Sequence, residues 1–210
     1  MARKCIFWDW NGTLLDDTLA ALNTLNTMLV KRGSPGISMG FYRDNFAFPV
    51  KPFYQRIGMV LENENWDDVA KEYHDIYATM PRSLNEGAIE ALDNAASFGI
   101  EQYVVSALRQ DLLEEELTKR GIISKFASVS GVDNLDGAGK ILRAKNLLAT
   151  LGDCNVVVIG DSLHDMEMAQ AIEAKCVLCS QGSHAHWRLE RVAPTAHTLI
   201  QAVDMAIKLL

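Results

Sequence analysis

The sequence lacks the features that mark several large classes of protein. Its 210 residues carry a net charge of −7 and show no cluster of lysine and arginine. We therefore expect no nucleic-acid partner, because clustered cations are what hold a phosphate backbone. No apolar run approaches the length of a membrane span, and the run after Arg3 and Lys4 is too short for a signal-peptide core. These absences predict a cytoplasmic protein with no membrane partner.

Cysteine is scarce, and its spacing excludes a zinc ribbon. Of the four cysteines, Cys176 and Cys179 form a single C-x-x-C, whereas a ribbon needs a second pair at matching spacing. We interpret all four as thiols buried in or near strands. The chain also has no internal repeat, low-complexity tract or long linker. It is long enough for one domain with a large insertion, or for two small domains.

What the sequence does contain is a short apolar run, residues 5–8, that stops at the carboxylate of Asp9. Such a run is typical of a strand buried on both faces. In an open α/β sheet, groups just past the carboxyl ends of strands line the ligand crevice, which suits Asp9 to be a nucleophile or a metal ligand. The alternative is a hairpin turn at Asn11-Gly12, with Asp9 a solvated strand end. Leucines at helical spacing from Leu19 to Leu29 disfavour that hairpin.

Residues 16–81 show a helical pattern without a confident strand, broken at residues 33–36, near Pro49 and Pro52, and at residues 63–65. This block lies between the first strand and everything that follows Pro81. We expect a helical domain over residues 16–81, inserted into a core domain made of residues 1–15 and 82–210.

Beyond Pro81, predicted strands alternate with predicted helices. The expected strands are residues 103–105, 127–129, 156–159 and 176–179. The expected helices are residues 86–98, 110–120, 140–151 and 163–174, followed by amphipathic segments at residues 184–191 and 198–209. Parallel neighbours need crossover connections, so this alternation predicts an α/β fold with a Rossmann-like, doubly wound parallel sheet.

Three predicted strands end in polar groups: Asp9, Ser106 and Asp161, with Asp165 one helical turn later. If these strands are neighbours, the polar groups converge at one edge of the sheet. Two carboxylates there would repel each other unless a cation lay between them, and Mg²⁺ takes oxygen ligands of this kind. Mg²⁺ commonly shares its ligand shell with a substrate phosphate. The pattern therefore predicts phosphoryl chemistry on a small phosphorylated metabolite.

Further roles follow from position. Ser106 and the N–H groups of Ala107 and Leu108 could hold phosphate oxygens at a helix N-terminus, although an ordinary N-cap serine fits equally well. Lys140, with Lys145 as the competing candidate, supplies the positive charge that phosphoryl transfer needs. Asp161 would bind metal directly. Asp165 has capping-box spacing from Ser162, and we place it behind the metal ligands.

In order along the chain, these motifs resemble the four motifs of the haloacid dehalogenase superfamily. They are Asp-Trp-Asn-Gly-Thr-Leu from Asp9, then Ser106, Lys140, and Gly-Asp-Ser-Leu-His-Asp ending at Asp165. The helical insert sits where relatives similar to phosphoglycolate phosphatases carry a C1 cap. The resemblance implies attack by Asp9 on phosphorus, giving an aspartyl-phosphate that water hydrolyses. It also implies an Mg²⁺ cofactor bound by Asp9, Asp161 and the backbone carbonyl of Asn11.

Asn11 departs from the pattern of the family's phosphatases, which usually carry a second Asp here. The resemblance assigns that carboxyl to protonating the leaving oxygen and then activating water. An amide cannot exchange a proton near neutral pH. Losing a general acid–base group typically lowers the rate by ~10²–10⁴. We therefore expect a slow or selective phosphatase, favouring leaving groups that need little protonation or using a proton carrier from the cap.

Three other functions compete with the phosphatase. Phosphonoacetaldehyde hydrolase, a related enzyme, also has Trp after its nucleophile and no acid at the next position, and Lys51 could supply its Schiff-base amine. A catalytically weak phosphate-binding module has Asn11 as its support. Dehalogenation is disfavoured, because displacing a halide needs neither Mg²⁺ nor Asp161.

Substrate specificity is expected to come from the helical insert. The candidate substrate contacts there are Arg43, Lys51, Tyr54 and Arg56. Two loop histidines beside the predicted site, His184 and His186, could bind ligand or metal or could be plain surface residues. A cap must open and close, and the candidate hinges are Asp16, Asp17 and the segment near Pro81.

Overall fold

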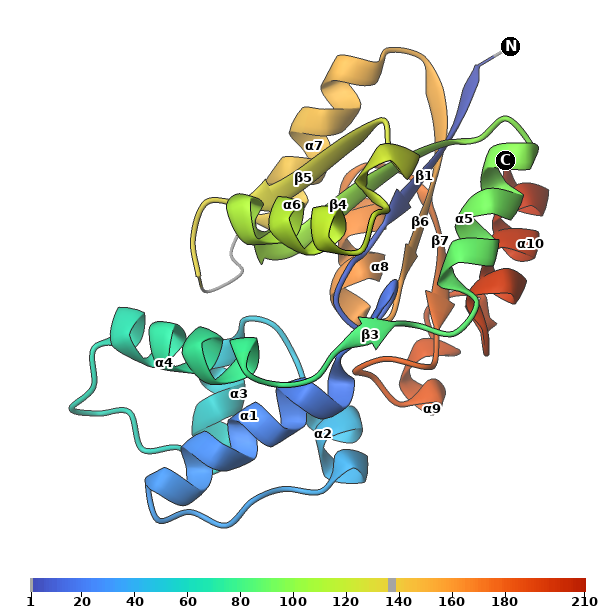
Figure 1. Cartoon of the computed structure of the whole chain (residues 1–210). Coiled ribbons are helices and arrows are strands. Elements are labelled where there is room, and N and C mark those ends of the chain that lie inside the picture. Colours follow the sequence, from blue (N-terminus) through green and yellow to red (C-terminus); the bar gives the residue numbers. More distant parts are fainter. Residues whose placement is uncertain (1, 136–138) are drawn as a thin grey trace.

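The computed structural model describes residues 2–135 and 139–210, and its centre is a six-stranded parallel sheet (Figure 1). The strand order is β5-β4-β1-β6-β7-β8. The strands are β1 (Arg3–Trp8), β4 (Glu101–Arg109), β5 (Ser128–Val132), β6 (Cys154–Gly160), β7 (Lys175–Cys179) and β8 (Thr195–Ala196). Every neighbouring pair is parallel, which confirms the predicted doubly wound α/β fold.

Helices cover both faces of this sheet. On one face, Ile6 and Trp8 of β1 pack with apolar residues of α5 (Ala88–Ser97), α6 (Gln110–Lys119) and α10 (Leu199–Leu209). On the other face, Cys5 and Phe7 pack with residues of α7 (Lys140–Leu151) and α8 (Leu163–Ala171). Successive β1 side chains thus alternate between two apolar clusters. The strand is buried on both faces, as the run at residues 5–8 predicts.

A separate helical block lies beyond the carboxyl ends of the strands (Figure 1). It comprises α1 (Thr18–Lys31), α2 (Met39–Asn45), α3 (Val50–Arg56) and α4 (Trp66–Ala78). The block has its own apolar cluster, which includes Leu25, Met28, Tyr42, Phe53 and Val69. Two short antiparallel strands, β2 (Leu15–Asp16) and β3 (Ser83–Leu84), join it to the rest of the chain. No helix in the described part of the chain is long and apolar enough to cross a bilayer.

The structure corrects several element boundaries. Asp16 lies in β2, so the segment that we expected to be without strands begins with one. Strand β4 continues to Arg109, well past Ser106. Strand β8, only two residues long, was missed, and the segment at residues 184–191 contains just the short helix α9 (His186–Leu189). After β1 the chain turns at Gly12, which has a φ of +77°. It makes an isolated bridge between Asn11 and Leu15 and does not form a hairpin with β1.

Candidate active site

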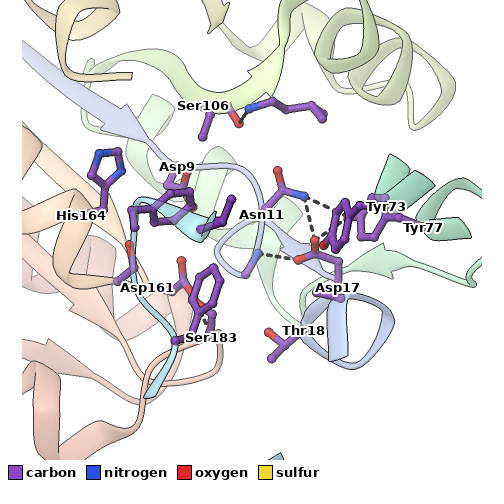
Figure 2. A pocket seen from close by; sticks show the side chains of 18 of the residues that line it. Asp9, Asn11, Asp17, Thr18, Tyr73, Tyr77, Ser106, Asp161, His164 and Ser183 are labelled. Atoms are coloured by element: carbon purple, nitrogen blue, oxygen red, sulfur yellow. Dashed lines mark hydrogen bonds between the residues drawn. The ribbon is translucent and has the colours of Figure 1, made fainter. Parts of the chain in front are cut away.

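The two acids predicted to meet do so at the carboxyl edge of adjacent strands. Trp8 of β1 is in register with Ile159 of β6, so Asp9 and Asp161 follow neighbouring strand ends. The Asp9 N–H also donates to the Ile159 carbonyl at 2.8 Å. Oxygens of Asp9, Asp161 and Asp165 all lie within 4.8 Å of one another. The sheet itself therefore brings the three carboxylates together (Figure 2 shows Asp9 and Asp161).

Lys140, the first residue of α7, lies between two of these acids. Its Nζ is 2.6 Å from Asp9 Oδ1 and 2.5 Å from Asp165 Oδ1, and the Lys140 side chain is 3% exposed. Burial opposes the charged form of Lys140, but Asp165 and Asp9 outweigh it and raise its pKa. Lys140 is therefore a fixed cation, whereas Lys145 is exposed on the same helix.

Asp165 is held by donors on its other oxygen. Its Oδ2 accepts hydrogen bonds from the Asp161 N–H at 3.2 Å, the Ser162 N–H at 3.0 Å and the Ser162 hydroxyl at 2.7 Å. The capping box expected of Ser162 and Asp165 is present. Burial opposes ionisation of Asp165, but Lys140 and Ser162 outweigh it and lower its pKa. Asp165 thus anchors Lys140 and the turn that carries Asp161.

Asp9 and Asp161 differ from Asp165, because their environment opposes ionisation. Burial raises the pKa of Asp9, and Asp165 and Asp161 add to the rise against the pull of Lys140. Burial and Asp165 raise the pKa of Asp161 to about 6, against donors on Ser183. Three buried carboxylates thus face one buried ammonium, a donor set that suits a small divalent cation. The residues present fit such a metal.

Two glycines make room for Asp161. A Cβ on Gly12 would lie 2.4 Å from Asp161 Oδ2, and a Cβ on Gly182 would lie 2.1 Å from the same oxygen. Any side chain at either position would collide with the carboxylate. The Ser183 N–H and hydroxyl both donate to Asp161 Oδ2 at 2.5 Å, which fixes that oxygen.

Asn11 points away from the three acids and toward the helical block (Figure 2). Its Nδ2 donates to Asp17 Oδ2 at 2.7 Å and to the Tyr77 hydroxyl at 3.0 Å. Asp17 Oδ2 also accepts from Tyr77 at 2.5 Å, and Asp17 Oδ1 accepts from the Gly12 N–H at 2.6 Å. Sequence reasoning named Asp17 as a hinge and missed this network. The signal available was an amide at position 11 beside a nearby acid.

The prediction for Ser106 as a helix-terminal residue is wrong. Ser106 is buried inside β4, and α6 begins only at Gln110. Its Oγ accepts from the Leu108 N–H at 3.0 Å, so that N–H is already engaged (Figure 2). The register of β4 with β5 shifts between Val105 and Arg109, an irregularity of the kind that redirects side chains. Ser106 and Ala107 nevertheless both line the pocket over Asp9.

The pocket encloses a cavity of about 150 Å³ between the sheet edge and the helical block. Its floor includes Asp9, Lys140 and Asp161. The helical block contributes six phenylalanine and tyrosine side chains to the lining: Tyr42, Phe46, Phe48, Tyr54, Tyr73 and Tyr77. Phe48 stacks on His164, from the turn after Asp161, with ring centroids 4.8 Å apart. Of the four proposed substrate contacts, Tyr54 alone is among the described lining residues.

The three cations expected to contact substrate lie elsewhere. The Arg43 guanidinium donates to the backbone carbonyls of Gln181 at 2.9 Å and Gly182 at 3.0 Å, which ties α2 to the loop after β7. Lys51 lies over the ring of Trp66 at 5.4 Å, and Arg56 is exposed on α3. Their placement follows from the orientation of the block, whose aromatic face is turned to the sheet.

The two candidate histidines also lie outside the described pocket lining. His184 is only 2% exposed, contrary to its interpretation as a surface residue, and its Nδ1 accepts from the Leu163 N–H at 3.0 Å. Burial lowers its pKa to about 3, so the ring is neutral. His186 begins α9 and stacks on His197, with ring centroids 4.7 Å apart.

Comparison with known proteins agrees with this geometry. The model of the haloacid dehalogenase-like hydrolase family matches residues 6–179, and the chain therefore belongs to that family of hydrolases. A predicted phosphatase from Clostridium acetobutylicum has a similar structure, with a TM-score of 0.81, 15% identity and full coverage of both chains. Protein Tyrosine Kinase A of Mycobacterium tuberculosis has a TM-score of 0.80, 20% identity and 98% coverage of each chain.

A predicted phosphoglycolate phosphatase from Haemophilus somnus is also similar, with a TM-score of 0.72, 17% identity and 97% coverage of each chain. No curated protein matches the chain by sequence. At these identities the structural likeness establishes the fold, and the residues of the site must carry the argument for the reaction.

Proposed function

We propose that this hydrolase is an Mg²⁺-dependent phosphatase that acts on a small phosphorylated metabolite through an aspartyl-phosphate at Asp9. The observation that carries the proposal is Lys140, whose Nζ lies 2.6 Å from Asp9 Oδ1 on the floor of a pocket between the sheet edge and the helical block. A buried lysine beside a buried carboxylate can offset the charge of an incoming phosphate. The phosphatases among the similar structures support the same class of reaction.

Asp9 is the proposed nucleophile. Lys140 holds Oδ1, while Oδ2 accepts a longer hydrogen bond, 3.2 Å, from the Thr13 hydroxyl, and we assign attack to Oδ2. A bond forms from this oxygen to phosphorus as the bond to the leaving oxygen breaks, and the electron pair departs with that oxygen. Water then attacks phosphorus and loses a proton to solvent, and the bond between Asp9 Oδ2 and phosphorus breaks, which releases phosphate and restores the carboxylate.

The metal site would be formed by Asp9, Asp161 and the backbone carbonyl of Asn11. A bound Mg²⁺ supplies charge neutralisation and polarises the phosphoryl oxygens. Asp165 keeps Lys140 and the Asp161 turn in place through the hydrogen bonds described above. Ser106 and Ala107 also line the pocket, and we assign the Ser106 hydroxyl and the Ala107 N–H to binding phosphate oxygens.

The Asn11 amide cannot act as the general acid. Its Nδ2 is engaged with Asp17 and Tyr77, and its chemistry offers no exchangeable proton near neutral pH. The enzyme is therefore expected to be ~10²–10⁴ slower, on poor leaving groups, than one with a carboxyl at this position.

We further propose that residues 16–81 form a cap over a core made of residues 1–15 and 82–210, in a cytoplasmic enzyme. The Arg43 link to Gln181 and Gly182 and the stack of Phe48 on His164 hold the block against the sheet edge. A reaction like that of phosphonoacetaldehyde hydrolase would require Lys51 as the Schiff-base amine. Lys51 is exposed, lies over the ring of Trp66, and is outside the described pocket lining. The structure gives no observation that favours that alternative or the binding module.

The test is Asp9-dependent phosphate release. A panel of phosphorylated metabolites is incubated with Mg²⁺ and with the wild-type protein, Asp9→Asn, or the matched control Asp204→Asn on the exposed side of α10. We expect release by the wild type and the control, and loss in Asp9→Asn. Equal phosphate release by the wild type and by Asp9→Asn would refute the assignment of Asp9 as the nucleophile.

A further inference from the structure

We infer that the substrate is an aryl phosphate: the phosphate monoester of a small phenol whose single ring carries no second anionic group. This inference rests on the proposed function and narrows its substrate class. Two independent observations carry it. One is the aromatic, cation-free lining of the pocket beyond the floor, and the other is the amide at Asn11, where a proton donor would otherwise help the leaving group.

The part of the pocket contributed by the helical block carries several aromatic side chains that could pack against a ring of the substrate. Tyr42 and Phe46 stack with centroids 4.9 Å apart, and Phe46 meets Phe48 edge-on at 5.4 Å. On α4, Tyr73 and Tyr77 stack with centroids 5.7 Å apart, and Figure 2 shows both beside Asn11 and Asp17. Aromatic rings favour stacked or edge-to-face partners over saturated groups. A leaving group that reaches this side of the pocket therefore meets ring faces and edges, together with the aliphatic side chains of Ala21, Leu25 and Val50.

The same lining gives no cationic partner to a second anion. Lys140 is the one lysine or arginine among the described residues of the pocket lining, and Asp9 and Asp165 already hold it. His74 is bound through Nε2 to the Leu135 carbonyl at 2.9 Å. On the block's side the charged group is the carboxylate of Asp17. Burying a substrate carboxylate beside it, without a cation, would be strongly unfavourable.

The volume of the cavity limits the size of the leaving group. The cavity measures about 150 Å³, and Asp9 and Asp161 on its floor are 5% and 2% exposed. A closed cavity of about this volume holds one benzene-sized ligand, and here the same space must take both the phosphoryl group and the leaving group. With the helical block in this position, the space above the floor therefore favours a leaving group of one small ring over a nucleoside.

The leaving group must also depart without help from position 11. A phenol ionises with a pKa near 10, as tyrosine does, whereas an alkyl alkoxide is far more basic. A phenolate can therefore carry away the electron pair of the broken bond without first receiving a proton. The Asn11 amide and the ring-lined pocket thus select the same chemical class.

The experiment compares kcat/KM for four monoesters with Mg²⁺. Phenyl phosphate against benzyl phosphate tests the leaving group, and we expect the phenyl ester to react ~10²-fold faster or more, within the range that a missing general acid costs. Benzyl against cyclohexylmethyl phosphate tests ring recognition at similar leaving-group basicity. There we expect a preference of about 2–12-fold for the aromatic ester, the value of one aromatic pair. Phosphoglycolate tests the anionic class and should be the poorest substrate.

Matched variants test whether the preference for the benzyl over the cyclohexylmethyl ester depends on the rings of the pocket. Phe48→Leu and Tyr73→Leu remove pocket rings, whereas Phe41→Leu removes a 43%-exposed ring from α2. We expect the first two to bring the benzyl-to-cyclohexylmethyl ratio toward one, and Phe41→Leu to leave it unchanged. A Phe41→Leu ratio that falls equally would overturn the assignment of the pocket rings.

The outcomes separate this inference from the proposed function. Asp9-dependent hydrolysis that is faster on phosphoglycolate than on phenyl phosphate would overturn the aryl phosphate and leave the phosphatase intact. Absence of Asp9-dependent hydrolysis on all four esters would overturn the aryl phosphate, and the phosphatase itself would also be overturned if the metabolite panel described above gave no Asp9-dependent release.

Discussion

The side-chain amide of Asn11 donates a hydrogen bond to the carboxylate of Asp17, with 2.7 Å between Nδ2 and Oδ2. The Tyr77 hydroxyl donates to the same oxygen, so one buried carboxylate joins the turn after β1 to helix α4. This arrangement explains why an amide suits position 11. A carboxylate there would face the carboxylate of Asp17 across a hydrogen-bond distance, and like charges so close resist joint ionisation.

Restoring a carboxyl at position 11 should therefore require a second change. We expect Asn11→Asp alone to lower stability and to give little gain in activity, because it brings two carboxylates together. The double variant Asn11→Asp/Asp17→Asn keeps one donor and one acceptor in contact. It should raise kcat/KM on benzyl phosphate at least tenfold over Asp17→Asn alone, toward the ~10²–10⁴ typical of a general acid. A double variant no faster than Asp17→Asn would show that the missing carboxyl does not limit the rate.

Removing the Lys140 ammonium should lower the free energy of unfolding, because it leaves the buried acids without their cation. In Lys140→Met, Asp9 and Asp165 lose their shared cation, and breaking a buried ion pair typically costs about 3–5 kcal/mol. Chemical denaturation in chelator should report a loss of this order. Lys145→Met, at an exposed position of the same helix, is the control and should change stability little. Similar losses in the two variants would contradict the role given to Lys140.

The stability of metal-free protein should depend on pH through Asp161. Burial and Asp165 raise the pKa of Asp161 from 3.8 to about 6 in the folded state. Between these values the folded protein binds a proton that the unfolded chain has released, so the contribution of Asp161 to stability falls as pH rises.

In chelator we therefore expect Asp161→Asn to be more stable than the wild type above pH 6, by on the order of 2–3 kcal/mol. The difference should shrink as pH falls toward 4, and Asp204→Asn should show no such trend. Thermal unfolding across pH measures both. A stability difference that is independent of pH would contradict the raised pKa. Adding Mg²⁺ should stabilise the wild type more than Asp161→Asn.

Arg43 should control how firmly the helical block is held. Besides its two bonds to the Gln181 and Gly182 carbonyls, its own carbonyl accepts from the Ala185 N–H at 3.1 Å and from Arg188 at 2.9 Å. Each bond to a charged donor is worth about 1.5–3 kcal/mol. In Arg43→Gln we expect amide exchange in the 181–185 loop to rise at least tenfold, with a higher KM. Arg56→Gln, at an exposed position, is the control, and an equal rise there would argue against the link.

Long elements with a clear period could be predicted from the sequence. The helix at Lys140–Leu151 has the expected bounds, and the apolar run at residues 156–159 lies within β6, because burial on both faces imposes a continuous pattern. Strand β8 could not be found, since Thr195 and Ala196 are too few to show a period. Ser106 misled the prediction of its strand, because a polar residue inside a strand was interpreted as its end. Its hydroxyl is satisfied locally by Leu108.

The core half of the site was also accessible to sequence reasoning, since parallel strands place Asp9 and Asp161 at one edge. The half contributed by the helical block was not. Which face of that block meets the sheet depends on its rotation, which no local pattern in residues 16–81 specifies. The described pocket lining therefore contains rings such as Phe48 and Tyr73. It does not contain the cations that we expected there, Arg43, Lys51 and Arg56. The functional roles of all these residues remain predictions for the experiments above.

The two-residue strands β2 and β3 carry one last implication. Where the chain leaves the sheet at Leu15–Asp16 it pairs with the point of its return at Ser83–Leu84, and the Asn85 N–H closes the junction on the Leu14 carbonyl at 2.9 Å. Exit and return thus share one stem (Figure 1). A segment grafted between Asp16 and Ser83 would inherit that stem and leave Asp9 in the sheet. If it also supplied partners for Asn11 in place of Asp17 and Tyr77, the selectivity for the leaving group could change by exchange of this one segment.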